Sequence, residues 1–366
     1  MSEDSDLVEE LNRWLAELVH AAGSDLHVKA GSPPRIRVEG RLRRLHRPPL
    51  TSEETEALVD VVLPQGRRAT FDERGDVDFA HSVPDLGRFR VNAFRQRGSA
   101  SMVFRLLQVG GLPFQDIGMP PIVQRLAEEP RGLVLVTGPT GSGKTTTLAA
   151  MIEHINRSQP VHIVTIEDPI EVLHPDHEAL VAQREVGQDT GDFLQAIRAA
   201  LREDPDVILI GEMRDAETVM AALQAAETGH LVLSTLHTTN AVETVNRVVD
   251  FFPPTQQHQA RVTLASALRG IVCQRLVPSR GGGRIAAVEV LVNTGRVAER
   301  ILNPSLTAQI KDVILEGEYY GMQTFDQSLL RLVRAGRVAV DDALATASEP
   351  HDFQLMLQQA RLLPTG

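Results

Sequence analysis

The pattern of apolar and polar residues changes partway along the chain. Up to residue 112, short segments alternate apolar and polar positions, whereas beyond residue 131 continuous apolar runs alternate with segments of helical period. Period-two alternation is typical of strands with one exposed face, and continuous apolar strands are typical of a parallel sheet covered on both faces. We therefore expect an α+β domain over residues 1–112, a linker over 113–130, and an α/β domain over 131–366.

Within the first domain, residues 7–19 have the spacing of an amphipathic helix, with one apolar face made of Leu7, Leu11, Trp14, Leu15 and Leu18. A second helix is expected over 52–63, with Ser52 as its N-cap. Residues 24–47 read as short strands with turns, and three further strands are expected near 76–82, 87–95 and 100–107.

The linker is expected because the stretch VGGLPFQDIGMPP at 109–121 is rich in Gly and Pro. After it come the apolar runs GLVLVTG, VHIVTIE, DVILIGE and HLVLSTLH, each followed by a helical stretch. The segment 272–292 reads as a hairpin whose loop contains Gly281–Gly283, and residues 296–362 read as helical. This order predicts a sheet covered by helices on both faces.

Composition indicates a folded cytoplasmic protein. The chain is 42% hydrophobic, and its acidic start, MSEDSDLVEE, lacks the basic and apolar regions of a signal peptide. No apolar run approaches the roughly 18 residues that span a bilayer, so no direct membrane insertion is expected. The single cysteine, Cys273, excludes an intramolecular disulfide and a multi-cysteine zinc site.

The net charge of −11 lies almost wholly in the second part of the chain. Residues 1–112 carry 16 basic and 17 acidic side chains, and residues 113–366 carry 21 and 31. This acidic balance argues against a protein that tracks along nucleic acid. The cations are 34 arginines and only three lysines (Lys29, Lys144 and Lys311), and this scarcity makes Lys144 a position to examine.

Lys144 lies in a phosphate-binding motif. The stretch 132–156, GLVLVTGPTGSGKTTTLAAMIEHIN, has the spacing Gly138-x4-Gly143-Lys144-Thr145 between an expected strand and an expected helix. Glycines let backbone N–H groups turn toward phosphates at a helix N-terminus, and the Thr145 hydroxyl can hold Mg²⁺. The residues expected to bind ATP are Gly138, Pro139, Thr140, Gly141, Ser142, Gly143, Lys144, Thr145 and Thr146.

Two apolar strands end in acid. VHIVTIEDPIE, 161–171, delivers Glu167 and Asp168, and DPDVILIGEMRD, 204–215, delivers Glu212. Side chains at the carboxyl ends of strands line the ligand crevice of doubly wound sheets. We therefore expect Glu167 and Glu212 to face the P-loop, where nucleotide hydrolysis needs a metal carboxylate and a group that activates water.

Histidines bracket another strand, because HLVLSTLHTTNA at 230–241 begins with His230 and carries His237 at its other end. The spacing does not fit a metal site. Two hydrogen-bonded core histidines are one interpretation, and sensors of the γ-phosphate are the other. The stretch HPDH at 174–177 is expected to be a surface turn.

With these residues in place, the chain resembles the secretion-superfamily ATPases, and among them the PilT-type retraction ATPases of type IV pili. The likeness covers nearly the whole chain, in family order. The matching stretches are SDLHV at 24–28, RFRVNAF at 88–94, GPTGSGKTTTLAAM, TIEDPIE, LREDPDVILIGEMRD, ETGHLVLSTLHTTNA and GMQTFDQSL at 321–329. The resemblance implies a RecA-like core with an N-terminal PAS-like domain.

The resemblance also implies roles. Glu167 would be the catalytic glutamate, Glu212 would act on Mg²⁺, and His230 and His237 would lie near the phosphates. Arginines of the N-terminal domain would reach nucleotide, often across a subunit boundary; these are Arg88, Arg90 and Arg105. The implied assembly is a homohexamer at the cytoplasmic face of the inner membrane, with a pilus platform protein as partner and no nucleic acid. Arg202, Arg214 and Asp215 receive no firm role.

Several branches of the superfamily remain to be distinguished. A single cysteine and the position of SDLHV at 24–28 favour retraction over the extension and secretion motors, which usually carry a zinc insertion and an added domain. The segment 293–306, NTGRVAERILNPSL, keeps only a loose likeness to the AIRAGLT-like motif of retraction motors. An accessory PilU-like ATPase, a poorly hydrolysing ring subunit and a nucleic-acid translocase are the alternatives.

Overall fold

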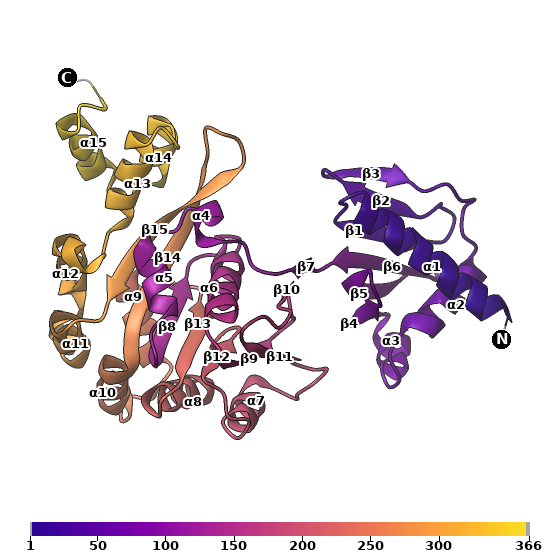
Figure 1. Ribbon diagram of the computed structural model, residues 1–366, viewed down its shortest axis with the longest axis horizontal. Coiled ribbons are helices and arrows are strands. Elements are labelled where there is room, and N and C mark those ends of the chain that lie inside the picture. The colour runs from indigo at the N-terminus through magenta and orange to yellow at the C-terminus, as the bar shows by residue number, and fades with distance from the viewer. Residues whose placement is uncertain (1, 364–366) are drawn as a thin grey trace. The chain divides into compact units, whose positions relative to one another are not determined.

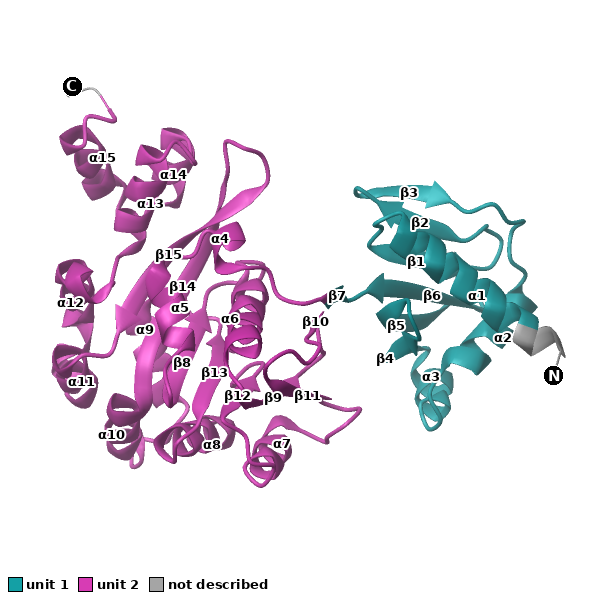
Figure 2. Cartoon of the chain, viewed as in Figure 1, with its two compact units in different colours: residues 1–108 teal, residues 109–366 magenta. Residues whose placement is uncertain are grey.

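The computed structural model describes residues 2–363 and divides the chain into two compact units, residues 1–108 and 109–366 (Figure 2). The outermost residues of the expected domain ranges, 1 and 364–366, lie outside the described part. Within the described residues, no helix is both long enough and apolar enough to cross a membrane.

The first unit is an antiparallel sheet with helices packed on one face (Figure 1). Apolar side chains from α1 and from alternate strand positions, such as Leu15, Leu26 and Phe89, share one buried core. The helices are α1 (Ser2–His20), α2 (Ser52–Val62) and α3 (Arg68–Arg74). In the sheet order β3-β2-β1-β6-β5-β4, the strands are β1 (Asp25–Lys29), β2 (Arg35–Val38), β3 (Arg41–Arg44), β4 (Asp76–Val83), β5 (Gly87–Gln96) and β6 (Ser99–Leu106).

The N-cap of helix α2 lies one residue earlier than expected. Thr51, not Ser52, is the N-cap: its hydroxyl accepts from the Glu54 backbone N–H, and the Glu54 carboxylate accepts from the Thr51 N–H at 2.7 Å. This reciprocal pair is a capping box. The Ser52 hydroxyl instead lies 2.8 Å from the Ser99 hydroxyl on β6. Two adjacent hydroxyl residues offered the same sequence signal, and the spacing to Glu54 decides between them.

The segment expected to be a linker folds as part of the second unit. It forms α4 (Phe114–Ile117) and α5 (Pro121–Ala127), and these short helices bury Phe114, Val123 and Leu126 against α6 and the central sheet. Gly and Pro separate the two helices and keep each below two turns, so the segment has the composition of a loop although its apolar residues are buried.

The second unit is built on a seven-stranded sheet that is parallel except for its last strand. In the order β11-β9-β12-β13-β8-β14-β15, its strands are β8 (Gly132–Thr137), β9 (His162–Glu167), β11 (Leu180–Glu185), β12 (Val207–Ile210), β13 (Leu231–Leu236), β14 (Leu268–Pro278) and β15 (Arg284–Val292). A two-stranded sheet pairs β7 (Gln108–Val109) with β10 (Val172–Leu173).

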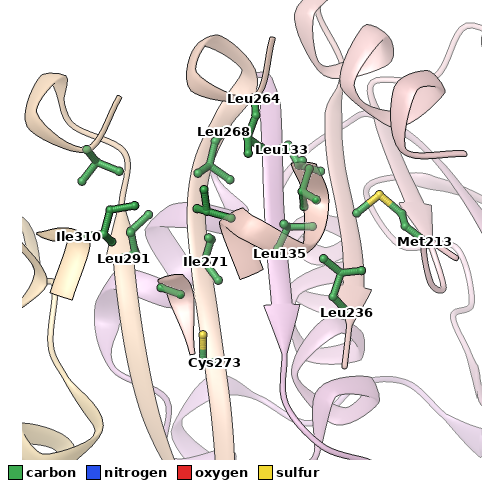
Figure 3. Packing of buried hydrophobic residues seen from close by; sticks show 14 of the residues in the cluster. Leu133, Leu135, Met213, Leu236, Leu264, Leu268, Ile271, Cys273, Leu291 and Ile310 are labelled. Carbon is green, nitrogen blue, oxygen red and sulfur yellow. The ribbon is translucent and has the colours of Figure 1, made fainter. Parts of the chain in front are cut away.

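Helices cover both faces of this sheet, as the continuous apolar runs predict (Figure 1). Along β8, Leu133 and Leu135 join one buried core, and Val134 and Val136 join the core on the opposite face. Figure 3 shows part of the first core, in which Leu133 and Leu135 lie near Leu264, Leu268 and Ile271. The helices of this core include α7 (Phe193–Ala200), α8 (Ala216–Glu227), α9 (Ala241–Asp250) and α10 (Gln257–Ala267), and α6 (Lys144–Ser158) belongs to the other core.

The expected hairpin and helical C-terminal region are present. β14 and β15 pair antiparallel, and the turn between them contains Gly281–Gly283. Thr324 caps α13 in a second capping box, and Gln323 bonds to Val290 of β15. The helices after the hairpin are α11 (Gly295–Leu302), α12 (Ile310–Glu316), α13 (Phe325–Arg334), α14 (Val340–Thr346) and α15 (Pro350–Gln359), with 3-10 turns at Pro304–Gln309 and Glu318–Tyr320.

We predict that Thr51→Ala lowers the stability of the first unit by about 1 kcal/mol, because it removes the capping box of α2. Urea unfolding followed by tryptophan fluorescence measures this, since the only tryptophan, Trp14, is buried in the core of this unit. Ser52→Ala is the matched control, for which we expect a change within about 0.5 kcal/mol. Equal losses in both variants would contradict the assignment of the cap.

Candidate functional site

The candidate site forms where four parallel strands end at one edge of the sheet. Ile210 of β12 pairs with Ile166 of β9 on one side and with Ser234 of β13 on the other. Thr137 of β8 in turn pairs with Leu236 of β13. The residues that follow these strands therefore emerge side by side, as expected for the ligand crevice of such a sheet.

The loop after β8 has the backbone that the P-loop pattern predicts. Gly138, Gly141 and Gly143 all have positive φ, and a Cβ on Gly138 would lie 2.5 Å from the Gln274 carbonyl oxygen and from the Ser142 hydroxyl. Only glycine fits there. Helix α6 begins directly after the loop, at Lys144. The Lys144 amine donates to the Gly138 and Pro139 carbonyl oxygens at 2.8 and 3.1 Å.

Side chains from all four strand ends surround one pocket of about 560 Å³, a size typical of small-molecule sites. Its lining includes most of the expected P-loop residues together with Glu167, Glu212 and His237. The full set is Thr140, Gly141, Gly143, Lys144, Thr145, Thr146, Leu148, Ala149, Glu167, Asp168, Pro169, Glu171, Val172, His174, Phe193, Leu209, Gly211, Glu212, Thr235, His237, Leu276 and Arg284. Gly138, Pro139 and Ser142 shape the loop behind this lining.

Glu167 follows directly on the buried residues of β9 and is held by two neutral donors. The Thr165 hydroxyl and the Gln183 side-chain amide both donate to its Oε1, at 2.7 and 3.1 Å, and so orient the carboxylate. Burial raises the pKa of Glu167 above its ordinary value, while the two donors oppose that shift. A carboxylate with a raised pKa is a stronger base than an exposed one.

Glu212 lines the pocket and contacts an arginine and a histidine. The Arg214 guanidinium contacts its Oε1, and His237 Nε2 lies 3.5 Å from its Oε2. Arg214 also lies 3.9 Å from Asp168, so this arginine, to which the sequence gave no firm role, spans two acids of the site. Asp215 is structural, because its carboxylate caps α8 by accepting from the Thr218 N–H at 2.8 Å.

His230 does not belong to the site, contrary to expectation. It immediately precedes β13, whereas His237 follows that strand. Its Nδ1 lies 2.9 Å from the Ala225 carbonyl oxygen at the end of α8, and the six residues of β13 separate it from His237. A strand of this length spans about 20 Å. The direction rule that selected the two acids excludes His230, because only carboxyl ends of parallel strands line the crevice.

HPDH is not simply a surface turn. His174 is buried and lines the pocket, while Asp176 and His177 are more exposed. Glu171 also lines the pocket, and its charge acts on both Lys144 and Glu167. The sequence could have indicated Glu171, because it lies close to Glu167 in the stretch TIEDPIE. For His174 the sequence offered none, because its burial arises from contact with α6.

The three arginines expected to reach phosphates lie on the first unit. Arg90 and Arg105 pair across β5 and β6, and Asp25 pairs with Arg105 from β1, so these side chains share one face of the sheet. Arg105 donates to Asp25 at 2.8 Å, and Arg90 lies 3.9 Å from Asp78. Arg88 is two residues before Arg90 and faces the same way. Arg202 belongs to the second unit and donates to the Arg198 carbonyl oxygen at the end of α7.

The residues present fit a magnesium ion held in part by a nucleotide. Thr145 and Glu212 offer hydroxyl and carboxylate oxygens in one pocket, which are ligands that Mg²⁺ prefers. Among the described residues there is no cluster of three or more His, Cys, Asp or Glu side chains that could hold a metal by itself. Mg²⁺ in phosphate-transfer sites usually has few protein ligands, because phosphate oxygens and waters supply the rest.

Known proteins resemble this chain along most of its length. The type IV pilus retraction ATPase PilT of Pseudomonas aeruginosa is 45% identical over 344 residues, which cover 94% of this chain and 100% of that protein. The type IV pilus ATPase PilU of the same organism is 41% identical over 350 residues, with 95% and 91% covered. A crystal structure of the pilus retraction motor PilT with bound ADP aligns with a TM-score of 0.84 and 44% identity, covering 92% of this chain and 96% of that one.

The fold and the site together define a P-loop ATPase of the secretion type, with a smaller N-terminal domain before the catalytic core. The family described as type II/IV secretion system protein matches residues 1–316. The chain belongs to this family, and within it to the PilT-type retraction ATPases.

We predict that Thr165→Val moves the acid limb of the ATPase pH profile to higher pH. The substitution removes a hydrogen bond that favours the charged form of Glu167, so the pKa of this already raised carboxyl rises further and the base is lost sooner as the pH falls. Steady-state ATPase rates between pH 5 and 8 measure the shift. Ser234→Ala is the control, because this buried hydroxyl donates to the Ile210 carbonyl oxygen instead. An unmoved limb in Thr165→Val would contradict the role of Glu167 as base.

Proposed function

We propose that this protein is a hexameric ATP-hydrolysing motor that powers type IV pilus retraction, and hence twitching motility, by disassembling the pilus at the inner membrane. The observation that carries the enzymatic part is the convergence of Glu167 and Glu212 on one pocket with Lys144 and Thr145. The similarity to PilT supports the biological part. Retraction is thus inferred from relatives, and hydrolysis from the site.

The phosphates of ATP would lie against the loop between Gly138 and Lys144. Backbone N–H groups of this loop and of the first turn of α6 can donate to phosphate oxygens, and the helix N-terminus favours the negative charge. The Lys144 amine, which bonds to two carbonyl oxygens of the same loop, supplies a positive charge at the β- and γ-phosphates. These groups bind and orient the nucleotide.

Glu167 would take a proton from the water that attacks the γ-phosphate. Its carboxylate is oriented by Thr165 and Gln183, and its burial makes it a better proton acceptor at neutral pH than an ordinary glutamate. Arg214 and His237 lie on the Glu212 side of the pocket, where their positive charge or N–H groups can meet negative charge as it develops on the phosphate.

Glu212 and Thr145 would hold Mg²⁺, directly or through water. When bound, the ion would supply positive charge that neutralises part of the charge on the phosphates. Glu212 serves this role better than Glu167 because it is paired with the Arg214 guanidinium, whereas Glu167 is held by neutral donors and has a raised pKa. The two acids thus have environments suited to different tasks.

The assembly we propose is a homohexamer in which arginines of the first unit complete a neighbouring subunit's site. Arg88, Arg90 and Arg105 present cations on one sheet face, while residues 113–366 carry 21 basic and 31 acidic side chains. A local cluster of arginines can meet acidic groups of a neighbouring copy, although each part of the chain is net negative. The further partner is an inner-membrane pilus platform protein, and no nucleic acid is involved. The motor would work at the cytoplasmic face of that membrane.

An accessory retraction ATPase is the second candidate, because PilU is 41% identical to this chain and PilT 45%. The segment 293–306 also departs from the retraction motif, and in the structure it forms α11 and the start of a 3-10 turn. An accessory motor would share the ATPase site and differ only in whether retraction depends on it.

We predict different phenotypes for the two acids. Glu167→Gln should bind Mg-ATP normally and hydrolyse it about 100-fold more slowly or worse, because the base is lost. Glu212→Ala should weaken the Mg²⁺-dependent part of nucleotide binding by at least about tenfold. Nucleotide titrations with and without Mg²⁺, together with ATPase rates, measure both. Glu289→Gln is the control, because this buried glutamate caps α9 and does not line the pocket. Identical phenotypes would remove the division of roles, and negligible rates in the wild type would favour a regulatory subunit.

In cells, deletion of the gene should leave surface pili that do not retract, and the wild-type gene should restore retraction while Glu167→Gln should not. Microscopy of labelled pili measures this directly. Slowed but persistent retraction would indicate the accessory role. Loss of all surface pili would point to extension and contradict the proposal.

A further inference from the structure

Two adjacent glycines, Gly110 and Gly111, begin the second unit by packing against the helix that follows the P-loop. A Cβ on Gly111 would lie 2.1 Å from the Ala149 carbonyl oxygen of α6, so no side chain fits at this position. The Gly110 N–H donates to the Leu173 carbonyl oxygen of β10 at 2.7 Å. We call residues 109–113 the crossover segment, because here the chain passes from one unit into the next.

Glu153 of α6 holds this segment from the side. It is 5% exposed, although it carries a carboxylate, and its Oε2 accepts from the Gly111 N–H at 3.3 Å. Arg157, one helical turn later, bonds to its Oε1 from solvent. Its contacts with Arg157 and Gly111 lower the pKa of Glu153 despite burial, so the carboxylate is charged at neutral pH. A buried charge of this kind needs a reason in the structure.

The remaining neighbours of Glu153 connect it to the pocket. His174 Nδ1 lies 3.5 Å from Glu153 Oε2, and the His174 ring is buried and lines the pocket. His177 Nε2 lies 3.6 Å from Oε1 on the more exposed side. Burial lowers the pKa of His174, so the imidazole beside this carboxylate is neutral at neutral pH.

Gln183 of β11 completes a continuous path to the catalytic carboxylate. Its Oε1 accepts from the His174 backbone N–H at 2.8 Å, and its Nε2 donates to Glu167 Oε1 at 3.1 Å. The path therefore runs from Glu167 through Gln183, His174 and Glu153 to the Gly111 N–H. Its links are hydrogen bonds except for the one between His174 Nδ1 and Glu153 Oε2, which is a polar contact of 3.5 Å. Every link is buried or half-buried, where polar contacts are strong and costly to leave unmade.

We propose that Gln183, His174 and Glu153 are positioning residues that transmit the state of the nucleotide pocket to the crossover segment. Bound nucleotide changes the surroundings of Glu167 and His174 directly, and it also fixes the start of α6, the helix that carries Glu153. A shift of either group changes the contact that holds Gly111. The inference rests on the proposed nucleotide site. It gives His174, in the stretch HPDH, a role in coupling in addition to lining the pocket.

Hydrogen exchange with mass spectrometry on the full-length chain tests this coupling. Saturating ADP should slow amide exchange in the peptide over residues 108–114 by at least about fivefold in the wild type. His174→Ala and Glu153→Ala should reduce that slowing to less than about twofold, while exchange in the P-loop peptide over residues 138–146 still slows. His174→Asn should restore the ADP-dependent slowing in the peptide over residues 108–114, because the asparagine amide nitrogen occupies nearly the place of Nδ1.

His162→Ala is the matched control, because this histidine begins β9 at the opposite edge of the sheet and its Nδ1 lies 3.0 Å from the Glu203 carbonyl oxygen. The proposal would be overturned if ADP slowed exchange in the peptide over residues 108–114 of His174→Ala as much as in the wild type. It would also be overturned if ADP did not change exchange in this peptide of the wild type. If Glu153→Ala fails to fold, the two His174 variants decide. Failure of the wild type to bind ADP, measured by titration, would instead count against the proposed function itself.

Discussion

The hydrogen-bonded register of β9, β12, β13 and β8 determines which side chains can meet a nucleotide. Because the four strands are parallel and aligned, Glu167, Glu212, His237 and the P-loop all leave the sheet at one edge. The apolar side chains on both faces of these strands fix that register, since a shift of one residue would move every side chain into the opposite core, whose packing it does not fit. The chemistry of the pocket therefore depends on the packing of two cores that touch no ligand.

This arrangement gives two carboxylates of one pocket distinct properties. Glu167 is enclosed and held by a hydroxyl and an amide, which orient it without neutralising it. Glu212 faces an arginine and a histidine and is partly open to solvent. Burial raises the pKa of Glu167 and its two neutral donors oppose that rise only in part, whereas Glu212 has the Arg214 guanidinium at its Oε1. A single fold can thus supply a base and a metal ligand within one crevice.

Much of this site could be predicted because its residues are marked either by a short sequence motif or by their position at the carboxyl end of a strand. The P-loop requires glycines at fixed positions, and apolar runs that end in acid mark the carboxyl ends of strands. His230, expected near the phosphates, precedes its strand and does not line the pocket. His174 and the helices of the expected linker could not be found from sequence, since their burial depends on contact with α6. The correct cap of α2 depended on a three-residue spacing to Glu54.

The scarcity of lysine has a consequence for chemical labelling. Lys144 lies in the pocket and burial lowers the pKa of its amine, so more of it is uncharged at neutral pH than for an exposed lysine. Lys29 and Lys311 are exposed on the surface, and the chain has no other lysine. An amine-directed electrophile shaped like a phosphate ester thus has one preferred target. Because bound nucleotide would shield Lys144, the mass additions count the subunits of an assembly whose P-loops are free of nucleotide at a given moment.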